Sequence, residues 1–108
     1  MKATWNNKGK QQLVAEAAKE DLIYIEGNWY FPPSSVKSDF LRKSATPYTC
    51  PWKGVCQYFD VGQGDSWSAD NAWSYPHPKD SAIEIVKKSS DKDFSDYVAF
   101  WQDVTVSD

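Results

Sequence analysis

Thr49-Cys50-Pro51-Trp52-Lys53-Gly54 is the stretch of this sequence with the least ordinary residue choices, and it predicts the turn around which the fold is organised. Pro51 stiffens the backbone and cannot continue a helix. Gly54 permits a sharp bend or the close approach of another backbone segment. Between them, Trp52 supplies a large ring with one polar group and Lys53 supplies a cation. A turn of this composition indicates either a structural corner or a functional site.

Runs of β-branched and aromatic residues extend from this turn in both directions and predict antiparallel strands. Val55–Val61 follows the turn directly, and the segment from Trp67 to Tyr75 predicts the next strand. Nearer the N-terminus, Gly27-Asn28 separates Leu22–Glu26 from Trp29–Phe31. Two turn-forming residues between β-rich runs predict a tight hairpin, because both tolerate positive φ angles.

Other segments lack the strand pattern. Arg42–Thr49, which contains Pro47, is predicted to be a loop, and Ser34–Leu41 is predicted to hold a single helical turn. A short helix is predicted from Ser81, because Ser81 and Glu84 have the spacing of a capping box. The residues Lys87-Lys88 suit the negative C-terminal end of that helix.

Together these patterns predict one domain over residues 1–108, of mainly-β class, with one short helix near the C-terminus. We expect compact antiparallel sheets, arranged as an open barrel or a β-tent-like sandwich. Six Trp, six Tyr and five Phe residues support sheets, since aromatic side chains favour pleated surfaces and bury large areas.

The charge pattern argues against several classes of partner. The formal net charge is −3, and the only basic clusters are the pairs Arg42-Lys43 and Lys87-Lys88, so general nucleic-acid binding is not expected. No apolar run approaches the roughly 20 residues of a membrane-spanning helix, so no membrane association is expected. Met1–Asn7 lacks the apolar core of a signal peptide, which predicts a cytoplasmic location.

Metal and cofactor chemistry finds little support in the residue pattern. The soft ligands Cys50, Cys56 and His77 form no C-x-x-C pair, so we expect free thiols, no metal site and no cofactor. His77 lies between two prolines and is interpreted as a surface residue rather than a catalytic base. Asp91-Lys92-Asp93 is interpreted as a solvated charge run, and Gly62–Asp65 as a hairpin turn without the Lys of a phosphate loop.

Two interpretations of the central turn remain open. In the first, Lys53 is a working cation whose pKa, if the side chain is partly buried, would be lowered so that it could act as a nucleophile or acid/base group. In the second, Trp52 fills the core, Cys50 packs as a small hydrophobe and Lys53 extends into solvent.

Five motifs, in this order along the chain, resemble the domain of unknown function 427 family, which is sometimes labelled nucleotidyltransferase-like. The resemblance implies a compact β domain and extends over nearly the whole chain. Nucleotidyltransferases combine a Gly-Ser turn with convergent aspartates on strands, an arrangement that this sequence does not show. The motifs are Trp5-Asn6, Glu26–Pro32 (with Gly27-Asn28 and Tyr30-Phe31), Cys50–Gly54, Ala72–Pro76 and Tyr97–Trp101.

The leading functional hypothesis is a small-molecule-binding domain with an aromatic-lined pocket near Cys50–Gly54. Lys53, Glu26 and Cys50 are the candidate catalytic residues, if the domain is an enzyme. The predicted ligand is small and polar or aromatic, since opposite charges can orient a polar group and rings can hold a flat one. The alternatives are a protein-interaction module, a carbohydrate-binding module and, last, a nucleotidyltransferase-like enzyme. The predicted ligand-binding residues are Tyr30, Trp52, Lys53, Trp73 and Tyr75.

Overall fold

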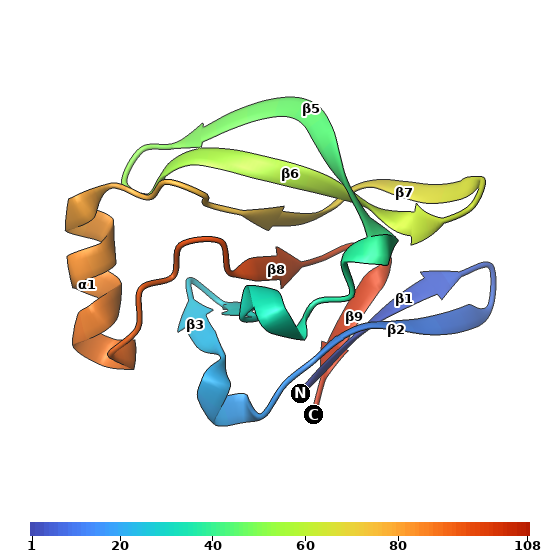
Figure 1. Ribbon diagram of the computed structural model, residues 1–108, viewed down its shortest axis with the longest axis horizontal. Helices are drawn as coiled ribbons and strands as arrows, with labels where there is room; N and C mark the ends of the chain where they lie inside the picture. Colours follow the sequence, from blue (N-terminus) through green and yellow to red (C-terminus); the bar gives the residue numbers. More distant parts are fainter.

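Nine β-strands in three antiparallel sheets dominate the computed structural model, which describes residues 1–108 (Figure 1). A four-stranded sheet has the order β5-β6-β7-β8, with bounds Leu41–Cys50, Gly54–Gln63, Ser66–Ser74 and Val98–Phe100. A three-stranded sheet has the order β2-β1-β9, with bounds Lys10–Glu16, Lys2–Asn7 and Val104–Ser107. A hairpin joins β3 (Ile23–Ile25) to β4 (Asn28–Tyr30). No sheet closes into a barrel, and the predicted mainly-β class with antiparallel sheets is confirmed.

The four-stranded sheet has a hydrophobic core on each face, because side chains alternate along its strands. Phe31, Val61, Ala72 and Phe100 belong to the first core, together with the inward residues of β1 and β2. The second core lies toward the β3–β4 hairpin and α1 (Asp80–Ser90), at the left of Figure 1. Its members include Tyr30, Cys50, Cys56, Trp73, Tyr75, Val86 and Phe94.

The β3–β4 hairpin forms as predicted, although its turn lies one residue earlier than the sequence suggested. Ile25 pairs with Asn28, so the two turn residues are Glu26 and Gly27. Their φ angles are +51° and +84°. Positive φ at both positions is typical of the type I′ hairpin turn, which prefers Asn, Asp and Gly. Glu26 is therefore an unusual residue at its position.

The predicted loop at Arg42–Thr49 is wrong, because these residues form most of strand β5. β5 lies at the edge of its sheet and pairs only with β6. An edge strand tolerates Pro47, since the missing N–H would have pointed away from the neighbouring strand. Ser34–Leu41 contains two 3₁₀ turns, Pro33–Ser35 and Ser38–Phe40, rather than one helical turn.

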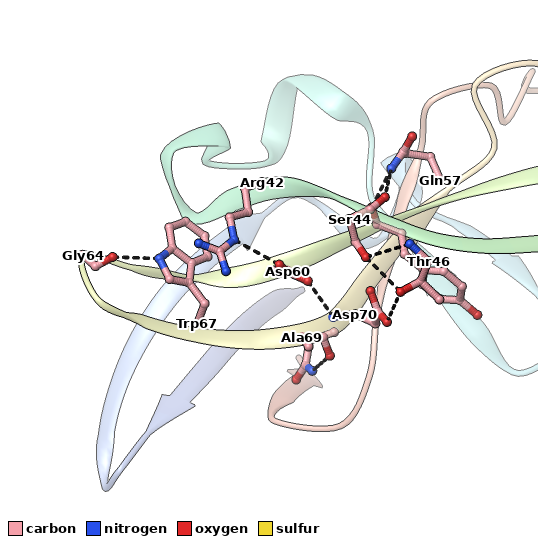
Figure 2. A network of polar contacts seen from close by, with 11 residues as sticks. Arg42, Ser44, Thr46, Gln57, Asp60, Gly64, Trp67, Ala69 and Asp70 are labelled. Carbon is pink, nitrogen blue, oxygen red and sulfur yellow. Dashed lines mark hydrogen bonds and ion pairs between the residues drawn. The ribbon is translucent and has the colours of Figure 1, made fainter.

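Irregularities in β5 and β7 are linked across β6 by polar contacts (Figure 2). Thr46 Oγ1, in β5, donates to Asp70 Oδ2 at 2.8 Å, and the Asp70 amide donates to Asp60 Oδ1 at 3.0 Å. Asp70 has a φ of +57°, so its backbone departs from the extended conformation. Its carbonyl oxygen then accepts a hydrogen bond of 2.6 Å from the indole of Trp101. The irregular stretch of β7 thereby fixes the position of Trp101.

Helix α1 is present where the sequence predicted a helix, but the predicted capping box is wrong. The helix begins at Asp80 with Lys79 as its N-cap, and no side chain caps its first turn. Lys79 is held at the N-cap by its backbone amide, which donates to the carbonyl oxygen of Lys53 at 3.0 Å. Asp80 in the first turn and Lys87 in the last complement the helix dipole. This is the longest helix in the structure, and no helix is long and apolar enough to span a membrane.

Candidate functional site

The predicted central turn connects β5 to β6 and is tied to the segment that leads into α1. Cys50 pairs with Gly54, which leaves Pro51, Trp52 and Lys53 in the turn. Gly54 has a φ of +116°, and a Cβ atom there would lie 3.5 Å from the carbonyl oxygen of His77. Lys79 Nζ also donates to the Pro51 carbonyl at 2.7 Å. Because both sides of the turn are anchored, the Lys53 side chain projects inward.

Lys53 and Glu26, which are 27 residues apart in the sequence, meet in an ion pair. Lys53 Nζ lies 2.7 Å from Glu26 Oε1. The Lys53 side chain is only 7% exposed, whereas that of Glu26 is 56% exposed. The carboxylate therefore reaches a buried cation from the solvent side.

Aromatic rings surround the buried ammonium group. Lys53 Nζ lies 5.1 Å from the ring centroid of Tyr75, 5.3 Å from that of Trp52 and 6.0 Å from that of Tyr30. The negative face of an aromatic ring attracts a cation at such distances. These rings and the Glu26 carboxylate together compensate the loss of water around Lys53.

A cavity of about 350 Å³ opens between the β3–β4 hairpin and the second-core face of the four-stranded sheet. Lys53 and Glu26 both line it, as do the predicted residues Tyr30, Trp73 and Tyr75. The complete lining is Glu26, Asn28, Tyr30, Tyr48, Lys53, Cys56, Tyr58, Trp73, Tyr75 and Trp101. Ligand pockets commonly have volumes from roughly 300 Å³ upward and mainly apolar walls with a few polar groups, a description that fits this cavity.

The pKa shifts leave the cavity with one cation. Burial alone would lower the pKa of Lys53, but its hydrogen bond to Glu26 and the nearby Tyr30 together raise this pKa above the ordinary lysine value. Lys53 is therefore charged at neutral pH, and the lowered pKa expected for a partly buried lysine is wrong. Burial raises the pKa of Cys56 to about 11 and also raises the pKa values of Tyr30 and Tyr75, so these groups stay protonated.

Two of the predicted site residues do not line the cavity. Trp52 is half-buried and flanks Lys53 from outside the lining, while Cys50 is buried within the second core. The thiol that lines the cavity is that of Cys56 instead. Cys50 and Cys56 are both free, and both are buried.

Sequence reasoning missed half of the cavity lining: Asn28, Tyr48, Cys56, Tyr58 and Trp101. Tyr48 lies in the stretch wrongly predicted to be a loop. The pairings Tyr48 with Cys56 and Tyr58 with Trp73 place these four side chains on one face of the sheet. If β5 had been recognised as a strand, its pairing with β6 would have indicated that Tyr48, Cys56 and Tyr58 face the same side of the sheet.

The remaining motifs lie apart from the cavity. His77 is exposed, as interpreted from its flanking prolines. Asp91 ends helix α1 in a left-handed conformation, and Asp93 accepts hydrogen bonds from Ser95, so neither aspartate lies on a strand. No three His, Cys, Asp or Glu side chains gather in an arrangement that could hold a metal ion.

The chain thus folds as three antiparallel sheets with an aromatic-lined cavity, in which the buried Lys53 meets the partly exposed Glu26. By comparison with known protein families, the chain belongs to the domain of unknown function (DUF427) family, whose match covers residues 8–107. The predicted family resemblance is thereby confirmed. No curated protein matches the chain.

Proposed function

We propose that this protein is a small-molecule-binding domain whose ligand enters the aromatic cavity and contacts Lys53 and Glu26. The observation that carries the proposal is the buried cation of Lys53, whose partner Glu26 lies on the solvent side, since a charged lysine is seldom buried without a specific reason. Burying a charged group adds little net stability, because the loss of its hydration offsets much of the attraction to its partner. A pair that borders a cavity can therefore serve recognition rather than stability.

The choice of residue at position 26 supports the same proposal. Glu26 has a φ of +51°, in a region that non-glycine residues other than Asn and Asp rarely adopt. Lys8 has a similar φ of +50° in the β1–β2 turn, so this conformation alone does not mark a site, and it is the carboxylate of Glu26 that distinguishes its turn. Asn or Gly at this position would satisfy the turn but could not bring a carboxylate to Lys53.

The concave site favours ligand binding over the alternative of a protein-interaction module, which calls for a contiguous exposed apolar patch. Trp101 is 42% exposed and Tyr48 is 46% exposed, and both line the cavity. The cavity therefore accounts for the exposure of these two rings. They would close around part of a bound ligand.

Ligand-observed NMR with a library of small polar, aromatic and sugar-like fragments tests this proposal. Fragments that bind the wild type are expected to lose binding to Lys53→Met, which keeps the length of the side chain but removes its charge. Met is chosen rather than Ala because the Lys53 side chain fills buried space, which a truncation to Ala would leave empty. The matched control is Lys37→Met, since Lys37 is exposed and makes no side-chain hydrogen bond or ion pair.

Two outcomes would contradict the proposal. One is a library screen that yields no binder to the wild-type protein. The other is a set of binders whose affinities are the same for Lys53→Met as for Lys37→Met, provided that both variants keep the wild-type fold by circular dichroism.

A further inference from the structure

The hydrogen-bonding capacity of the ion pair is only partly used. An ammonium group has three donors, and Lys53 Nζ donates one hydrogen bond to a protein acceptor, Glu26 Oε1 at 2.7 Å. The second carboxylate oxygen of Glu26 accepts no hydrogen bond from the chain. The cavity therefore offers a spare donor beside a spare acceptor.

The charges at the cavity balance. Lys53 is the only cation in the lining and Glu26 is its only carboxylate. The thiol of Cys56 and the phenols of Tyr30, Tyr58 and Tyr75 have raised pKa values, so they contribute no charge at neutral pH. An anionic ligand would leave an uncompensated charge among the aromatic walls, which is costly, and a cationic ligand would be repelled by the buried Lys53 ammonium.

The walls favour a flat ligand. Trp73 and Trp101 lie with ring centroids 5.3 Å apart and planes at 70°. Tyr48 and Tyr58 face the same cavity from β5 and β6, with ring centroids 6.5 Å apart. Rings set at steep angles to one another present both faces and edges, against which a planar ring can stack or pack edge-on.

We propose that the ligand of this site is a neutral, planar heterocycle with an adjacent carbonyl and ring N–H, that is, a cyclic amide or lactam. Its carbonyl oxygen accepts a hydrogen bond from Lys53 Nζ, and its N–H donates to the free oxygen of Glu26. This inference rests on the proposed ligand-binding function and specifies the chemical class of the ligand.

Four bicyclic probes of nearly equal size test the inference by isothermal titration or fluorescence. 2-Quinolone carries the adjacent carbonyl and N–H, whereas 1-methyl-2-quinolone lacks the N–H. Quinoline-2-carboxylate is an anion and 1-methylquinolinium is a cation. The wild type is expected to bind 2-quinolone best, and loss of the N–H is expected to weaken binding roughly tenfold, the cost of one unsatisfied hydrogen bond.

Charge variants of the pair should change the order of preference. Glu26→Gln leaves the cavity with a net positive charge, so quinoline-2-carboxylate should become the preferred probe. Lys53→Met leaves a net negative charge, so 1-methylquinolinium should become the preferred probe. If Glu26→Gln does not fold, Glu26→Asn removes the same charge and suits the positive φ of the turn.

The outcomes separate this inference from the function on which it rests. Preference of the wild type for the anion or the cation, or an identical probe order in all three proteins, would overturn the lactam assignment and leave the binding function standing. If all four probes fail to bind while library fragments still bind in a manner that depends on Lys53, the lactam assignment is likewise overturned and the binding function stands. Failure of the probes and of the whole library would overturn both.

Discussion

Trp73 and Tyr30 join the largest sheet to the β3–β4 hairpin through a buried hydrogen bond, in which the indole N–H donates to the phenol oxygen at 3.0 Å. Their rings meet edge to face, with centroids 6.2 Å apart and planes at 90°. Both side chains also line the cavity. The bond therefore sets the separation between the two walls of the site.

Tyr30→Phe is expected to destabilise the protein by about 1–2 kcal/mol, because it leaves a buried indole N–H without an acceptor. Urea denaturation followed by tryptophan fluorescence measures the change. Tyr24→Phe is the control, since Tyr24 is 57% exposed and lies on the same hairpin. Equal stability of the two variants would show that the Trp73 bond contributes nothing.

Gly62 is expected to tolerate no side chain. A Cβ atom at this position would lie 2.2 Å from the carbonyl oxygen of Ser66 and 2.7 Å from Trp67 Cα, and backbone atoms cannot move aside cheaply. Gly62→Ala should therefore cost about 3 kcal/mol or more, as severe overpacking does. Gly64→Ala is the matched control in the same hairpin: it has open space, and its φ of +59° should limit the cost to about 1 kcal/mol. Thermal melts of both variants test the order.

Alkaline pH is expected to weaken the fold through Cys56. Burial raises the pKa of this thiol from 9.0 to about 11. The folded protein holds the proton more tightly than the unfolded chain does, so the free energy of unfolding is undiminished below pH 9.0 and falls as the pH rises toward 11. Burial also raises the pKa of Tyr30, which adds to the fall above pH 10.0. Urea denaturation from pH 7 to 11 should give a flatter profile for Cys56→Ala than for the wild type, and parallel profiles would contradict this cause.

Asp60 is expected to matter more than the arginine with which it pairs. Its carboxylate accepts from Arg42 Nε and from the Asp70 amide, each at 3.0 Å, and Arg42 also lies over the ring of Trp67 at 4.4 Å (Figure 2). Asp60→Ala removes the acceptor that supports the irregular backbone at Asp70 and should cost about 2 kcal/mol. Arg42→Ala removes a largely exposed ion pair and should cost about 0.5–1 kcal/mol. A larger loss for Arg42→Ala in chemical denaturation would reverse this interpretation.

Most strands and the β3–β4 hairpin could be predicted because each depends on local residue preferences. β5 was missed because its residues do not have the usual preferences of a strand. An edge strand of polar residues that contains Pro47 resembles a loop until its pairing with β6 is known. The positions of Cys56 and Tyr58 in the cavity lining were missed for the same reason, because strand pairing determines which face of the sheet they occupy.

The charge state of Lys53 illustrates a different limit. The sequence left open whether this side chain is buried or extends into solvent. The direction of its pKa shift could not be predicted, because it depends on Glu26, which lies 27 residues earlier and meets Lys53 only in the folded chain.

The position of the largest sheet between two separate cores has a consequence for how this protein can change. Neighbouring residues of one strand, such as Phe59 and Tyr58, lie in different surroundings. Phe59 packs against the first core, whereas Tyr58 lines the cavity. Substitutions at cavity-facing positions can therefore accumulate without disturbing the opposite interior. A library that randomises Tyr58 and Trp101 but keeps Phe59 and Ala72 would sample new ligand preferences on an unaltered scaffold.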